Sequence, residues 1–183
     1  MTNVKIDRGV AFDGAAIPQG GIGNYMLLIN KEDLDNGAIT VDAVSHEIET
    51  ITLDAGTYAY KVESSKGSAQ IIPSCALRVV SAIDGFDHSV DAIFLDASQL
   101  SRENIAKMRF QKVVAIVPLA TGKSIMYGRN VGMRISAFDE KPGDADTGGI
   151  IKAMLVTPAN DPPEKDPPIL IESTFDILTL LSA

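Results

Sequence analysis

The sequence predicts a single, mainly β domain, 1–183, with a β-sandwich or β-barrel core, one flanking α-helix at about 99–110, and long extended loops and arms. Apolar and polar residues alternate with a period of two in many short segments, which is typical of half-buried strands. One segment has a helical pattern free of glycine and proline. A chain of 183 residues also buries enough surface to fold around one core without disulfides or metal.

Five segments show the strand pattern most clearly. The segment 112–117, KVVAIV, is apolar on both faces, as expected of a central strand. In 86–95, His88 falls on the apolar face, which predicts a half-buried, hydrogen-bonded histidine. The other three segments are 58–62, 131–137 and 150–157, and shorter candidates are 25–29, 46–53, 70–72, 76–81 and 124–127.

The helix is expected where Ser98 or Ser101 can cap the free amides and where Leu100, Ile105 and Met108 share roughly one face. The C-terminal FDILTLLSA fits either a last strand or a short helix.

Three segments predict arms or loops. The glycine-rich 1–24 predicts an N-terminal arm, and DEKPGDADTGG (139–149) and PANDPPEKDPP (158–168) predict projecting loops. Paired prolines fix φ and exclude helix, so 158–168 must be extended.

Composition excludes several classes of protein. The net charge of −8 argues against a protein that grips nucleic acid through its phosphates. The single Cys75 cannot form an intramolecular disulfide, and two histidines with one thiol are too few for a dense zinc site, which favours assembly in a reducing compartment. No apolar run reaches the roughly 18 residues of a membrane-spanning helix, and the first residues lack the apolar core of a secretory signal.

Charge is distributed unevenly along the chain. Residues 1–100 carry 6 basic and 14 acidic groups, 102–134 have a local charge of +6, and 135–183 have −6. Such blocks form either solvated faces or complementary faces of neighbouring subunits.

A possible phosphate-binding loop, Thr121-Gly122-Lys123-Ser124, follows the apolar strand. The motif requires a glycine where this chain has Val117, and it requires a helix where strand-like residues follow. A hairpin turn is the better interpretation.

Two other motifs are also incomplete. Asp144 and Asp146 begin like a calcium loop, but Gly148 and Leu155 occupy the fifth and twelfth positions, so an acidic turn is favoured. Gly20-Gly21-Ile22-Gly23 has Met26 where a dinucleotide-binding loop needs its third glycine, so a flexible arm is favoured.

For nucleophilic catalysis the candidates are Cys75 or a serine with His46 or His88, and neither local nucleophile signature is present. His46 is expected at the surface, and Cys75 is expected to behave as a small apolar residue. The absence of Trp disfavours a carbohydrate-cleaving site. The sequence therefore predicts no catalytic site, no cofactor-binding site and no metal site, and it predicts that the chain is not an enzyme.

Several segments together resemble tail tube and related tail structural proteins of bacteriophages, particularly those from Bacteroidetes hosts. They are GAAIPQGGIGNYMLLIN, TYAYKVESSKGSAQ, the strand–helix–strand of 86–117, and KSIMYGRNVGMRISAFDEKPGDADTGGIIKAMLVTPA. The last block is the most specific, because a strand ending in Tyr-Gly (124–128), a second strand (131–138), an acidic loop (139–149) and a closing strand (150–157) follow in the family's order.

The resemblance implies a virion protein, assembled in the host cytoplasm, that forms rings, usually hexameric, stacked into a tail tube around a DNA channel. The implied partners are other copies of itself and other tail or connector proteins, with long loops reaching neighbours and edge strands paired across subunits. An acidic lumen would let DNA pass without adhering, since like charges repel. The proline-rich 158–168 departs from the family's simplest form, which leaves a long tube or a single ring near a connector both open. The alternative is a capsid decoration or adhesin-like β-sandwich binding module.

Overall fold

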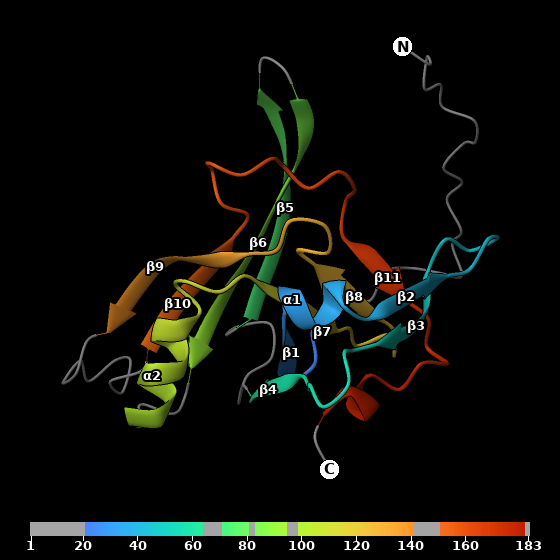
Figure 1. Ribbon diagram of the computed structural model, residues 1–183, viewed down its shortest axis with the longest axis horizontal. Coiled ribbons are helices and arrows are strands. Elements are labelled where there is room, and N and C mark those ends of the chain that lie inside the picture. The colour runs from blue at the N-terminus through green and yellow to red at the C-terminus, as the bar shows by residue number, and fades with distance from the viewer. Residues whose placement is uncertain (1–20, 64–70, 81–82, 95–98, 141–150, 182–183) are drawn as a thin grey trace.

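The computed structural model in Figure 1 describes residues 21–63, 71–80, 83–94, 99–140 and 151–181. The protein is mainly β with few helices, which confirms the predicted fold class. The elements are β1 (Tyr25–Asn30), α1 (Lys31–Asp35), β2 (Ala38–Val41), β3 (Ile48–Thr52), β4 (Tyr60–Glu63), β5 (Ile71–Val80), β6 (Ile83–Phe94), α2 (Gln99–Lys107), β7 (Val113–Pro118), β8 (Ser124–Tyr127), β9 (Arg134–Glu140), β10 (Ile151–Val156), β11 (Ile169–Ile171) and the 3-10 helix η2 (Ile177–Leu180).

The strands form two sheets that curl into a half-barrel. The larger sheet has the order β2-β3-β11-β8-β7-β1-β4, and the smaller one has the order β5-β6-β10-β9. All pairs in the smaller sheet are antiparallel. The long hairpin of β5 and β6 extends beyond the rest of the sheet, at the top of Figure 1.

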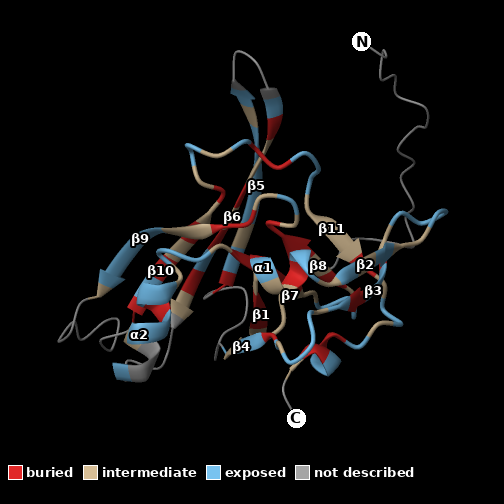
Figure 2. Ribbon diagram, viewed as in Figure 1, coloured by how far each residue is buried: buried red, intermediate tan, exposed pale blue. Residues whose placement is uncertain are grey.

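β1 and β7 belong to two hydrophobic clusters at once. Alternate residues of each strand, such as Leu28 and Ala115, pack between the two sheets against β6, β10 and Ile105 of α2. The intervening residues, such as Leu27 and Ile116, pack on the other face against α1, β3, β8, β11 and η2. Figure 2 shows β1 and β7 buried at the centre. The prediction that 112–117 is a central strand is confirmed.

Most expected elements are present with small changes of boundary. The expected strands 70–72 and 76–81 overlap one strand, β5 (Ile71–Val80), which tolerates Pro73 because it lies at the edge of its sheet. The predicted helix ends at Lys107, after which the amides of Phe110 and Gln111 turn back to the Lys107 carbonyl. The C-terminal segment forms η2, while α1, β2 and β11 had not been predicted.

The expectation that 158–168 projects from the core is wrong for its middle. Glu164 is fully buried, and its backbone pairs with that of Phe86 through hydrogen bonds of 2.8 and 2.9 Å. This approach requires Gly85, because a Cβ there would lie 2.5 Å from the Glu164 carbonyl oxygen.

The other two expected arms lie largely outside the described residues. Of 1–24, residues 21–23 pair with the end of β7, where the Gly23 amide donates to the Pro118 carbonyl at 2.7 Å. Of 139–149, Asp139 and Glu140 end β9. In the described part of the chain, the helices are too short or too polar to cross a membrane.

Candidate functional site

A buried polar cluster holds the proline-rich segment against the turn between β8 and β9. The Glu164 carboxylate accepts hydrogen bonds from the backbone amides of Asn130, Val131 and Gly132 at 2.8, 2.9 and 3.1 Å. Lys112 and Asp161 form an ion pair of 2.9 Å beside it. Because the chain itself fills this anion-binding turn, the cluster is structural.

His88 belongs to the same region and is hydrogen-bonded, as predicted, but it is fully buried where a half-buried position had been expected. Its Nδ1 accepts a hydrogen bond of 2.9 Å from the Gly128 amide, and its ring meets Tyr127 edge-on. Burial lowers the pKa of His88, and the nearby Glu164 carboxylate offsets part of that shift. His88 is therefore a neutral hydrogen-bond acceptor that fixes a turn.

The structure does not assemble the catalytic candidates into a site. Cys75 is exposed on β5 and lies opposite His88, but His88 Nδ1 is already bonded to the backbone. Desolvation raises the pKa of the Cys75 thiol and Asp87 adds to the rise, which disfavours a nucleophilic thiolate. His46 lies in the turn between β2 and β3 with φ of 59°.

The lysine of the incomplete phosphate-binding motif has another partner. Lys123 pairs with Glu47 at 2.5 Å, and Gly122 has φ of 84° in the turn between β7 and β8. The calcium-loop candidates Asp144 and Asp146 lie outside the described residues. Within those described, no group of three or more potential metal ligands is gathered.

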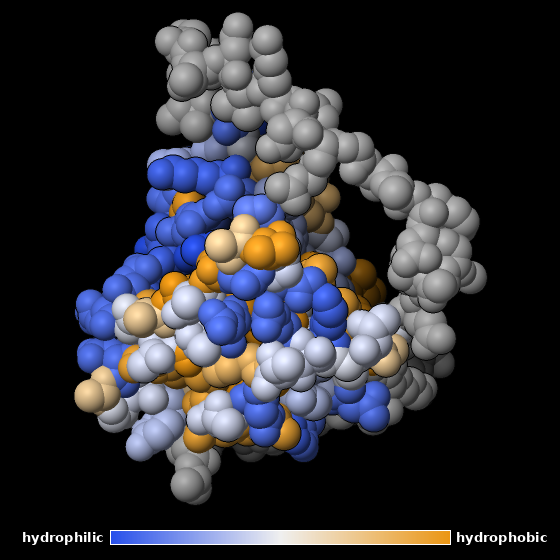
Figure 3. Space-filling view, turned by 90° about the vertical axis from the view of Figure 1, so that its right-hand side faces the viewer, coloured by the Kyte–Doolittle hydropathy of each residue, from blue (hydrophilic) through white to orange (hydrophobic). Residues whose placement is uncertain are grey.

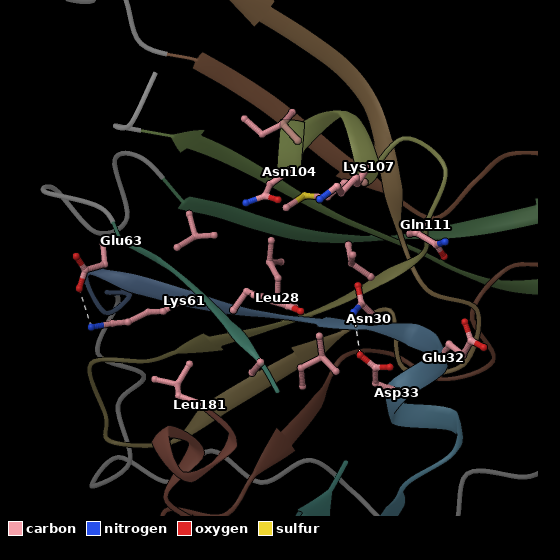
Figure 4. Close-up of a pocket in the computed structure, with 17 residues that line it drawn as sticks. Leu28, Asn30, Glu32, Asp33, Lys61, Glu63, Asn104, Lys107, Gln111 and Leu181 are labelled. Carbon is pink, nitrogen blue, oxygen red and sulfur yellow. Dashed lines mark hydrogen bonds and ion pairs between the residues drawn. The ribbon is translucent and has the colours of Figure 1, made fainter. Parts of the chain in front are cut away.

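A groove of about 1040 Å³ opens between α2 and the β1–β4 edge. It exists because β4 pairs with β1 only as far as Leu28, so that no described strand continues this edge alongside Ile29 and Asn30. In Figure 4, Asn104 and Lys107 of α2 lie on one side, while β1 and β4 form the other. The groove has an apolar floor with polar side chains along its rim. Nothing in the sequence pattern predicted this groove, since it depends on the unequal lengths of two paired strands.

Unlike the groove, the β5–β6 hairpin is a protruding surface, and it carries exposed apolar side chains. Leu77 and Val79 of β5 are 65% and 73% exposed, although they lie on the face that continues from buried Ile71. Ile72, on the other face of β5, is 53% exposed. On the side of the molecule shown in Figure 3, hydrophilic residues cover much of the surface, and hydrophobic residues are visible between them.

The outer face of the smaller sheet carries nearly balanced charge. By register, Asp91 and Asp139 share this face with Lys152 and Arg134, and Asp87 is paired with Arg78 at 2.5 Å. The acidity of the chain is therefore not concentrated on this face of the sheet.

Comparison of the chain with protein-family models, with curated proteins and with solved structures found no match.

Proposed function

We propose that this protein is a structural subunit of a bacteriophage tail, which assembles through its smaller sheet into rings around a channel for DNA. The observation that carries the proposal is the four-stranded antiparallel sheet with two open edges. β5 and β9 are its outer strands, and the described residues place no strand beyond either one.

The strand directions suit closure into a ring. β5, β6, β10 and β9 alternate in direction, so β9 of one copy and β5 of the next meet antiparallel when the copies stand side by side in the same orientation. An edge of exposed amides and carbonyls is a template for another strand, and a closed ring removes it. The resemblance noted above adds the expectation of hexamers. The proposal does not depend on an acidic lining, since the outer face of this sheet is nearly neutral.

Electron microscopy and sedimentation velocity of the purified protein test this proposal. Rings or tubes are expected, and a strict monomer at high concentration would contradict them. Ile72→Lys on the edge strand β5 should weaken assembly, because a lysine on an edge disfavours strand addition. Val44→Lys is the matched control, since Val44 is 83% exposed in the turn between β2 and β3, away from this sheet. Equal assembly by both variants would count against edge pairing. A monomer that binds a glycan or capsid would support the recognition module instead.

A further inference from the structure

We propose that two copies meet in one fixed register at the ring seam, the junction of β9 of one copy with β5 of the next. In this register Phe138 of β9 lies directly opposite Leu77 of the neighbouring β5, and Glu140 lies opposite Cys75. The inference rests on the proposed function, because it assumes that the open edges of the smaller sheet meet, and it specifies how they meet.

Each open edge carries apolar side chains that its own copy leaves exposed. On β9, Phe138 is 49% exposed, although it shares a face with buried Ala153. On β5, Leu77 and Val79 are 65% and 73% exposed, and they share the face of buried Ile71. Ala153 and Ile71 belong to one cluster between the two sheets. The exposed side chains of both edges therefore lie on the same face of the smaller sheet, the inner face, and edge pairing would bring them together.

The backbone hydrogen bonds of β6 fix the direction in which its amides and carbonyls point. The backbone of Phe86 exchanges bonds of 2.8 and 2.9 Å with Glu164, and the His88 carbonyl accepts one of 2.9 Å from the Thr157 amide. These bonds lie on the side of β6 away from β5, where Thr157 directly follows β10. Backbone groups alternate in direction along a strand, so even-numbered residues of β6 bond towards β10 and odd-numbered ones towards β5.

This alternation identifies the residues of β5 that face its open edge. The β5 partners of the even-numbered β6 residues are not bonded to them, so their amides and carbonyls point outward. These outward residues include Cys75, Leu77 and Val79. Pro73 is also among them, which explains why its missing amide leaves the β5–β6 ladder intact.

The same reasoning identifies the outward residues of β9. Ala153 pairs with an even-numbered β6 residue, Ala92, and therefore bonds towards β6. Its partner on the other side, Phe138, is left with its amide and carbonyl facing the open edge, as is Glu140 two residues later. On both edges the outward residues are thus those with side chains on the inner face. One pairing can therefore satisfy the hydrogen bonds and match the side-chain faces at once.

Proline and glutamate favour one register among those that remain. Phe138 can lie opposite three outward residues on the projecting part of β5, namely Cys75, Leu77 and Val79. In the first of these registers Glu140 lies opposite Pro73, which has no amide to donate. In the third, the half-buried Glu140 carboxylate lies opposite an apolar side chain. The second register pairs Phe138 with Leu77 and avoids both costs.

The second register also has a stagger that suits a closed barrel. Within one copy a single row crosses the four strands through Phe138, Ala153, Ala92 and Ile71. Pairing Phe138 with Leu77 of the next copy shifts this row by six residues along β5, a stagger of about 20 Å across a width of about 19 Å. The strands would then tilt by about 46°, near the roughly 35–45° of closed barrels. The third register would need about 54° and the first about 35°, so tilt rejects the third and Pro73 rejects the first.

Disulfide trapping with the chain's own cysteine tests the register. Glu140→Cys adds a thiol opposite the exposed Cys75 of the next copy, where a Cα separation of about 5.5 Å suits a disulfide. Within one copy β5 and β9 lie at opposite edges of the sheet, about 14 Å apart, so the same two thiols cannot join. Mild oxidation of this variant should therefore give a ladder of covalent oligomers.

Two further cysteine variants serve as controls for the ladder. Asp139→Cys is the matched control, because its side chain lies on the outer face one residue away, and it should give no ladder. Phe138→Cys would lie opposite Cys75 only in the first register. A ladder from either control that equals or exceeds that of Glu140→Cys would overturn the register, and so would the absence of a ladder from Glu140→Cys.

Truncation of the two apolar side chains tests their contact without thiol chemistry. Phe138→Ala and Leu77→Ala should each weaken association roughly ten-fold in sedimentation velocity. The double variant should lose less than the product of the two, because both changes remove the same contact. Phe110→Ala is the matched control, since Phe110 is 71% exposed after the end of α2 and lies outside both sheets. An equal loss in Phe110→Ala, or a fully multiplicative double variant, would overturn the contact.

The outcomes also separate the register from the proposed function. Rings that Ile72→Lys disrupts, but that give no ladder from Glu140→Cys, would overturn the register and leave the proposed function standing. A ladder from a protein that makes no rings or tubes would support the register and overturn the proposed function. A strict monomer would overturn both.

Discussion

Replacing Glu164 with alanine tests whether the proline-rich segment is part of the folded core. The carboxylate is fully buried and accepts three backbone amide hydrogen bonds. A hydrogen bond to a charged group contributes about 1.5–3 kcal/mol. The three do not add fully, because Asn130 is exposed and Val131 is only half-buried, so water can reach their amides in the variant. We therefore expect Glu164→Ala to lower the free energy of unfolding by about 3–5 kcal/mol.

Urea unfolding followed by circular dichroism measures this loss. With a slope near 2 kcal/mol per molar urea, the midpoint should fall by about 2 M. Glu164→Gln should cost about 1–3 kcal/mol, because its amide oxygen still accepts but its NH₂ group faces donors.

The control is Glu172→Ala, which removes a half-buried carboxylate bonded to the hydroxyls of Ser45 and Thr174. It should cost less than about 1 kcal/mol. A Glu164→Ala midpoint equal to that of the control would refute the structural role assigned to the cluster.

Three further predictions concern His88, Gly85 and the core. Because the native pKa of His88 is lowered from 6.5, the unfolded chain binds more protons than the native one below that pH. Stability should thus fall as pH drops through about 6.5 towards the native pKa, and His88→Gln should flatten this part of the urea-unfolding profile relative to the wild type. Gly85→Ala should lower the free energy of unfolding by about 1–3 kcal/mol, because the added Cβ would meet the Glu164 carbonyl. Gly56→Ala should cost less, since its Cβ would meet open space although the residue has φ of 81°. Calorimetry that ranks the two variants in the reverse order would contradict the close approach at Gly85. Ile116→Ala should cost about 2–5 kcal/mol and Ile116→Val about 0.5–1.5 in chemical denaturation, whereas equal costs would place Ile116 outside the tightly packed core.

The strands that could be predicted are those whose local pattern agrees with their final environment. β7 is apolar on both faces and is central, and β8 matches its predicted bounds, 124–127, because Gly122 and Gly128, at φ of 84° and 78°, define the turns around it. The elements that could not be predicted depend on distant partners. β11 has only three residues, and it is a strand because β8 and β3 lie on either side of it.

The candidate surfaces were harder to predict than the strands. The sequence indicated no catalytic or metal-binding motif, but it gave no sign of the groove or of the buried carboxylate. PPEKDPP has the composition of an exposed loop, and Glu164 is buried only because Gly85 and the 130–132 amides come together from remote parts of the chain. The sequence also did not indicate that the β5–β6 hairpin projects, because Leu77 and Val79 have the pattern of ordinary half-buried strand residues.

The burial of β1 on both faces has a consequence during synthesis. β1 emerges early from the ribosome with four consecutive apolar residues, 26–29, all of which are fully buried in the final structure. Its central partner β7 is made only after β5, β6 and α2, so the nascent strand has no neighbour on that side until residues 113–118 have been made. Chains that fold through such distant strand pairings fold slowly, and they expose aggregation-prone segments until the partner strands are available. Residues 25–30 are thus expected to stay exposed and prone to aggregation until β7 has been made.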